Sequence, residues 1–145
     1  MNRLETINKD LSEKIDRSTN ETILNRINLN TCDFAINEGN LSDNKIVEEI
    51  NSKLQNKEVI SDDDIQTISD LMERHDELYF DYDDNGQGEE AMIEFGKTRA
   101  LASLLYALQY YNTTNIDLLK ESIYEASMIN EDNSDFFNTL QNMIE

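Results

Sequence analysis

The longest uninterrupted helical pattern of this chain runs from residue 89 to residue 111. Apolar residues recur there on almost every face of a helix, which is typical of a helix buried among others. Small residues at positions 96, 100, 103 and 107 form a stripe that predicts close helix packing. No charge occurs between Arg99 and Asp117, but the twelve residues from Ala100 to Tyr111 are too few for the roughly 20 that span a bilayer. The pattern therefore predicts the central, buried helix of a soluble protein.

Four helices are predicted ahead of residue 60, where apolar residues step by three and four. The first covers residues 4–15, and a Ser18-x-x-Glu21 capping box starts the second. A left-handed Gly39 ends the third, and one of residues 42 and 43 caps the fourth.

A long helix is predicted to begin at Ser61, because a hydroxyl caps the first turn and the three aspartates that follow favour the positive end of the helix dipole. Residues 81–88 are predicted to form a loop before the central helix, and two more helices follow the central one. The sequence thus predicts an all-α fold, with a seven- to eight-helix bundle in a single domain (1–145) around the central helix (89–111). A bundle is favoured over a solenoid, which needs several repeated units.

Composition supports this fold class. Proline is absent and only four glycines occur in 145 residues, so little interrupts a helix. The single cysteine cannot form an internal disulfide. The first ten residues lack the basic start and apolar segment of a secretory signal. We therefore expect a cytoplasmic protein.

Charge is distributed unevenly along the chain. The sequence contains 12 Lys and Arg against 31 Asp and Glu, a formal net charge of -19. Residues 61–90 contain twelve of these carboxylates and one cation, Arg74, which gives this stretch a net charge of -11. A field of this sign repels nucleic acid and anionic membranes and attracts basic proteins. The expected partner is therefore a basic protein, and neither nucleic acid nor a membrane.

No constellation typical of catalysis is visible. His75 is the single histidine, and its place on an apolar helix face predicts a partly buried structural side chain. Cys32 has no activating neighbour in the sequence and is predicted to be an inert, buried thiol. Lys97 and Arg99, the only cations of the central helix, are expected to pair with nearby carboxylates. We expect neither an enzyme nor a cofactor.

Residues 81–86 match the beginning of a calcium-binding EF-hand loop. Asp81, Asp83 and Asn85 would place oxygens at loop positions one, three and five, and Gly86 stands at position six, where the loop turns sharply. The twelfth position is Met92 instead of the bidentate glutamate. The alternative is a turn rich in aspartate and asparagine that satisfies the ends of two helices.

The most acidic stretch is the predicted partner-binding surface. Mixed charges would suffice for solubility, whereas concentrating one sign costs like-charge repulsion. Aromatic side chains inside the stretch could serve as anchors. The predicted partner-binding residues are Asp70, Glu73, Asp76, Glu77, Tyr79, Phe80, Asp81, Tyr82, Asp83, Asp84, Glu89 and Glu90.

In size, charge, helical pattern and lack of catalytic motifs, the whole chain resembles small acidic bacterial immunity proteins, including those of contact-dependent growth inhibition systems. It also resembles phage inhibitors that mimic nucleic acid. The first resemblance implies a protein that occludes the basic active site of a nuclease toxin in the same cytoplasm. A calcium-responsive binding module working through residues 81–90 is a further alternative. The free protein is expected to be a monomer.

Overall fold

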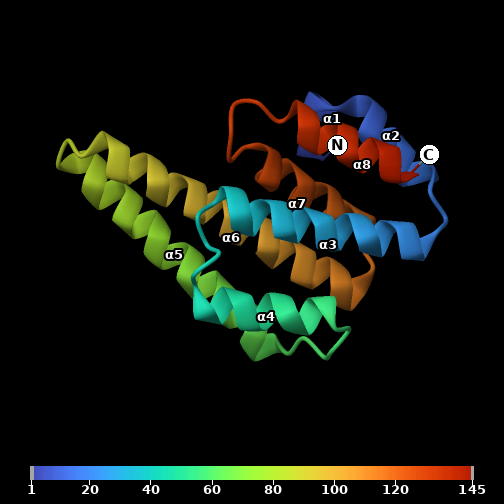
Figure 1. Cartoon of the computed structure of the whole chain (residues 1–145), viewed down its shortest axis with the longest axis horizontal. Helices are drawn as coiled ribbons and strands as arrows, with labels where there is room; N and C mark the ends of the chain where they lie inside the picture. The colour runs from blue at the N-terminus through green and yellow to red at the C-terminus, as the bar shows by residue number, and fades with distance from the viewer. Residues whose placement is uncertain (1, 145) are drawn as a thin grey trace.

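The structure is a computed structural model that describes residues 2–144, and within that range it contains eight α-helices and no β-strand (Figure 1). No helix of these residues is both long enough and apolar enough to cross a bilayer. The helices pack into one domain, so the predicted all-α bundle of seven or eight helices is confirmed. In chain order they are α1 (Arg3–Ile7), α2 (Lys9–Arg17), α3 (Glu21–Glu38), α4 (Lys45–Gln55), α5 (Asp62–Asp84), α6 (Gly88–Thr113), α7 (Ile116–Ser127) and α8 (Ser134–Ile144).

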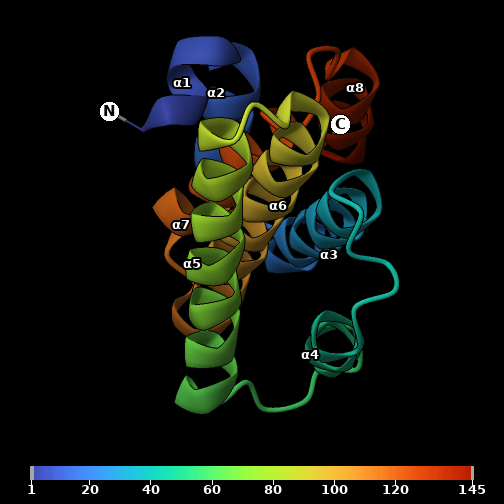
Figure 2. The ribbon, with the colours of Figure 1, turned by 90° about the vertical axis from the view of Figure 1, so that its left-hand side faces the viewer.

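Helix α6 is the central element, as its sequence predicts. It packs against α3, α5 and α7 (Figures 1 and 2). Its small-residue stripe does bring helices close together: a Cβ added to Gly39 at the end of α3 would lie 2.4 Å from the Cβ of Ala100. On the side toward α7, the hydroxyl of Ser103 donates to the backbone oxygen of Ser122 at 2.8 Å.

Several predicted helix starts are wrong, because asparagine takes the capping role. The predicted first helix divides at Asn8, whose side chain accepts from Leu11 N and caps α2. Asn20, rather than Ser18, caps α3, and Asn44, rather than residue 42 or 43, caps α4. Asparagine caps about as well as serine or aspartate, so sequence alone does not choose between neighbouring candidates.

The predicted end of the third helix is also wrong. Residues 31–38 continue α3 instead of forming a separate short helix. Gly39 has a φ of -86°, and the left-handed residue is Asn40, with a φ of 59°. The backbone N–H of Leu41 then donates to the carbonyl of Ile36, which closes a Schellman motif. Glycine is needed at position 39 for the contact with α6 and not for its backbone angle.

The helices at the two ends of the chain, α1, α2 and α8, form one part of the bundle together with α7, and we call it the terminal part. α1 packs on α7, and α2 packs on α8 and α7. α5 and the first half of α6 form an antiparallel hairpin whose tip projects away from this part (Figure 1). The predicted working surface lies on that hairpin.

Candidate partner-binding surface

Helix α5 begins as its sequence predicts. The hydroxyl of Ser61 accepts from the backbone N–H of Asp64 at 3.1 Å, and the carboxylate of Asp64 accepts from the backbone N–H of Ser61 at 3.0 Å. Lys53 of α4 also lies 3.1 Å from that carboxylate. The hydrogen bond from the backbone of Ser61, with help from Lys53, lowers the pKa of Asp64. The ion pair of Lys53 with Asp64 thus joins the start of α5 to α4.

The end of α5 contradicts the predicted calcium loop. Asp81 and Asp83 lie in the last turn of the helix, and only residues 85–87 connect it to α6. The N–H of Gln87 donates to the carbonyl of Tyr82 and that of Gly86 to Asp83, so this turn is another Schellman motif. Gly86, with a φ of 74°, is the left-handed residue of this helix end.

The prediction of a loop over residues 81–88 is therefore wrong. The alternative, a turn whose aspartate and asparagine residues satisfy the ends of two helices, is only partly met: backbone N–H groups close the end of α5, and Gln87 gives the start of α6 no side-chain cap. A Schellman motif and an EF-hand loop both use a glycine shortly after carboxylates, so the local sequence matches both. Within residues 2–144, no three His, Cys, Asp or Glu side chains gather as a metal ion would require.

His75 joins the two helices of the hairpin. Its Nδ1 lies 2.5 Å from Oε2 of Glu94, and both side chains are mostly buried. The predicted structural role of His75 is confirmed, but its partner was missed. The signal was present, since Glu94 is an isolated carboxylate between Ile93 and Phe95 in an otherwise apolar stretch of α6.

The predicted carboxylates all lie on the surface of this hairpin. We call residues 70–95 the acidic hairpin. All nine of the predicted carboxylates are exposed, and none forms an ion pair with a residue that the structure describes. They are Asp70, Glu73, Asp76, Glu77, Asp81, Asp83, Asp84, Glu89 and Glu90.

Five of these carboxylates lie along one outward face of α5. They are Asp70, Glu73, Glu77, Asp81 and Asp84. Their spacing of three and four residues keeps them in line along a helix. Between the first, Asp70, and the last, Asp84, the stripe extends roughly 21 Å at 1.5 Å per residue. Like-charged neighbours at this spacing repel each other and destabilise a helix slightly.

Exposed apolar side chains accompany the carboxylates. Phe80 is 56% exposed, Met92 is 62% exposed and Ile93 is 48% exposed. Of the three predicted aromatic anchors, only Phe80 is exposed, because Tyr79 and Tyr82 are half-buried. The sequence prediction missed the exposure of Met92 and Ile93, because the pattern placed them in a helix buried on all sides.

Two other predictions concern residues inside the fold. Cys32 is buried, and burial, with a smaller effect of Asp33, raises the pKa of its thiol well above the usual range, so the thiol stays protonated.

Arg99 is paired as expected, with Nη1 2.8 Å from Oε2 of the buried Glu125. Lys97 forms no ion pair with any residue between 2 and 144.

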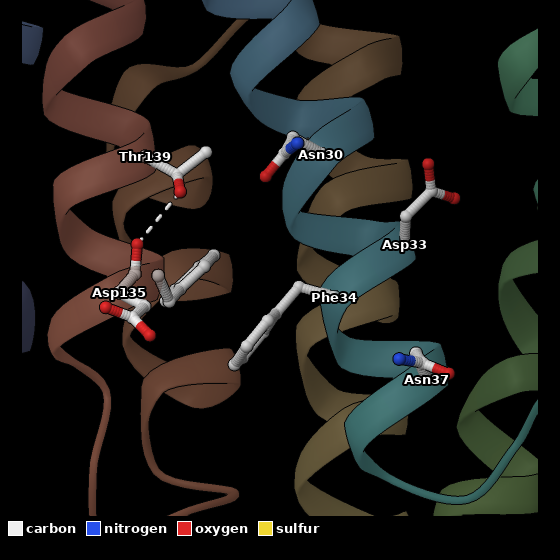
Figure 3. A pocket seen from close by; sticks show the side chains of 7 residues that line it. Asn30, Asp33, Phe34, Asn37, Asp135 and Thr139 are labelled. Atoms are coloured by element: carbon white, nitrogen blue, oxygen red, sulfur yellow. Dashed lines mark hydrogen bonds between the residues drawn. The ribbon is translucent and has the colours of Figure 1, made fainter.

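A separate hollow lies between α3 and α8. It is an open groove of about 490 Å³, where Phe34 of α3 points toward α8 and its ring stacks 4.1 Å from that of Phe136 (Figure 3). Asp33 points to the other side of α3 and accepts from Asn51 and Gln55 of α4. This groove was not predicted from the sequence.

The fold and this surface define the molecule as an all-α bundle with a projecting acidic hairpin. No protein-family model matches the chain, and neither curated proteins nor solved structures give a significant match.

Proposed function

We propose that this chain is an acidic immunity or inhibitor protein, which binds the basic active site of a nuclease toxin through the acidic hairpin. The observation that carries the proposal is that none of the nine exposed carboxylates forms an ion pair with a described residue. Arg74 is the one Lys or Arg of the hairpin, and it forms no ion pair with another described residue. The charges of the nine carboxylates are therefore available to a partner.

The physical basis is competition for a site built for polyphosphate. A nuclease groove holds a phosphate backbone with lysine and arginine side chains. A rigid helix that presents a line of carboxylates can bind to the same cations and cover the groove. Long-range attraction between opposite charges also speeds the encounter, by roughly 10- to 1000-fold. Inhibition requires occlusion alone and no chemistry on the part of this chain.

The shape of the hairpin favours insertion over contact between flat surfaces. Its tip projects from the rest of the fold (Figure 1). The His75–Glu94 pair and the contact of Tyr79 with Phe95, with ring centroids 5.9 Å apart, hold the two helices together below the tip. A pre-organised projection loses little conformational entropy on binding.

The experiment is a titration of nuclease activity. The probe is a basic nuclease domain; if the neighbouring reading frame encodes an exported toxin, its basic C-terminal domain is used. We expect stoichiometric inhibition by the wild-type chain and a loss of inhibition when Asp76, Asp83 and Asp84 are all changed to lysine. The matched control changes Asp43, Glu49 and Glu58 to lysine, which alters net charge equally at exposed carboxylates outside the hairpin.

The control variant should inhibit almost as well as the wild type. Circular dichroism of both variants checks that the domain remains folded. Equal inhibition by the two variants would show that net charge acts without a defined surface. No inhibition by the wild-type chain at any ratio would reject the proposed function.

A further inference from the structure

A cavity of about 260 Å³ lies beside the acidic hairpin, at the junction of α5, α6 and α7. This volume is several times the roughly 30 Å³ that one water takes in the liquid. It is smaller than the approximately 300–1,000 Å³ of sites that enclose drug-sized ligands. The cavity therefore has room for one side chain of a partner. Its lining includes Asp76, Tyr79, Phe95, Thr98, Arg99 and Glu125.

Among these lining residues, Glu125 is already occupied. Its Oε2 binds Arg99 at 2.8 Å, and its Oε1 binds Arg3 at 2.8 Å. Asp76, by contrast, forms no ion pair with any residue that the structure describes, and it is exposed. The lining holds two carboxylates and one guanidinium, a net charge of -1. The cavity therefore favours a cation, with Asp76 as its carboxylate.

The fold already binds two guanidinium groups around Glu125 in one arrangement. Arg99 lies over the ring of Phe95, 5.2 Å from its centroid, and Arg3 lies over the ring of Tyr124, 4.4 Å from its centroid. In both cases the arginine contacts a ring and the carboxylate of Glu125. Planar guanidinium groups stack on aromatic faces and bind carboxylates, whereas an ammonium group acts as a point charge.

Asp76 and Tyr79 offer the same combination of carboxylate and ring, one turn apart on α5. Among the described residues, no arginine stacks on Tyr79 or pairs with Asp76, although Arg99 lines the same cavity. We propose that the cavity is a socket for an arginine side chain of the basic partner, whose guanidinium stacks on Tyr79 and binds the carboxylate of Asp76. The identity of the partner rests on the proposed function. The chemistry of the socket rests on the cavity itself.

Two exposed apolar side chains, Phe80 and Met92, lie near residues that line this socket, one by a ring contact and the other by its place on the helix. Phe80 lies edge-on to Tyr79, with ring centroids 5.2 Å apart. Met92 stands three residues before Phe95, so both lie on one face of α6. Apolar side chains around a charged contact exclude water and strengthen it, as at the centre of protein interfaces. The socket thus combines a charged contact with an apolar rim.

The test uses N-acetyl-arginine amide as the probe and N-acetyl-lysine amide as its comparison. Both are titrated into the ¹⁵N-labelled full chain at low salt, and backbone amide shifts are followed by NMR. We expect saturable shifts centred on residues 76–79 and 98–102, with tighter binding of the arginine compound. Asp76→Asn should weaken the binding about tenfold, which is the effect of one charge-assisted hydrogen bond.

The matched control is Glu77→Gln, which removes the same charge one position away, on the outward face of α5. It should weaken the binding clearly less than Asp76→Asn does, because Glu77 does not line the cavity and acts only through its longer-range field. Equal effects of the two substitutions, or equal affinity for the two compounds, would overturn the proposal.

The two proposals can fail separately. If D76N and E77Q lose nuclease inhibition to the same extent, the socket is wrong and the acidic surface stands. If the arginine compound binds in the cavity but the nuclease is not inhibited, the socket stands and the proposed function is wrong.

Discussion

Carboxylates have different surroundings in the acidic hairpin and in the terminal part of the bundle. In the terminal part, carboxylates are paired: Arg3 binds Glu121 and Glu125, and Lys120, itself 2% exposed, binds Asp16. In the hairpin, nine exposed carboxylates have no such partner among the described residues. Of the four Lys and Arg in residues 61–145, Arg99 and Lys120 pair with carboxylates, and Arg74 is the one that lies within the acidic hairpin.

This difference separates stability from recognition. A buried or half-buried pair is costly to break because the remaining charge is left without its partner. Exposed carboxylates contribute little to stability, and their mutual repulsion opposes folding slightly. We therefore expect charge removal to destabilise the terminal part and to leave the hairpin folded.

The largest effect is expected from Glu125→Ala. The substitution leaves the guanidinium groups of Arg3 and Arg99 without their shared carboxylate. Because both arginines are partly exposed, we expect a loss of roughly 2–3 kcal/mol in the free energy of unfolding, somewhat less than for a fully buried pair. Urea unfolding measures it. Glu121→Ala is the control and should cost clearly less, because Arg3 keeps its contact with Glu125.

Two glycines provide the next comparison. Gly39→Ala places a methyl group 2.4 Å from the Cβ of Ala100, so α3 and α6 must move apart. Overpacking of this kind costs about 1–3 kcal/mol. Gly88→Ala at the start of α6 meets no atom within 4 Å and should stabilise the hairpin slightly. Thermal unfolding that shifted equally in both variants would contradict this contrast.

Asp64→Asn tests the one paired carboxylate at the base of the hairpin. Its pKa is lowered in the folded state by the hydrogen bond from Ser61 and by Lys53. The carboxylate therefore stabilises the fold above its ordinary pKa near 3.8, and this contribution is lost as pH falls through the lowered value. We expect the substitution to cost about 1 kcal/mol at pH 7. The difference from wild type should shrink in urea unfolding as the pH falls below 3.8, and it should vanish once the Asp64 carboxyl of the folded protein is protonated.

The smallest effect is expected on the outward face of α5. Changing Asp70, Glu77 and Asp84 to their amides removes like-charge repulsion between neighbours on the helix. The urea midpoint should rise slightly at low salt, and the gain should disappear at high salt, where repulsion is screened. A fall in the midpoint at low salt would mean that these carboxylates support the fold.

Periodicity predicted the all-α fold and the central helix because burial determines both. It could not choose among adjacent caps such as Ser18 and Asn20, whose preferences are nearly equal. It misplaced the left-handed residue at Gly39, because contact with Ala100 of another helix decides that position. Contacts between separate helices, such as His75 with Glu94, leave only an indirect signal in a single sequence.

The surface prediction had a similar limit. Charge composition located the acidic face on residues 70–90, since an exposed helix face needs no tertiary information. The accessible Met92 and the cavity beside Tyr79 depend on how α5, α6 and α7 pack together. These features appear only in three dimensions.

The most direct test of the central claim is the association rate with the nuclease domain, measured by stopped flow across a range of salt concentrations. We predict fast association that falls steeply with salt for the wild-type chain and for the control with lysine at positions 43, 49 and 58. Lysine at positions 76, 83 and 84 should slow association at least about tenfold and flatten its salt dependence. Identical salt dependence in the two triple variants would contradict a role for the acidic hairpin.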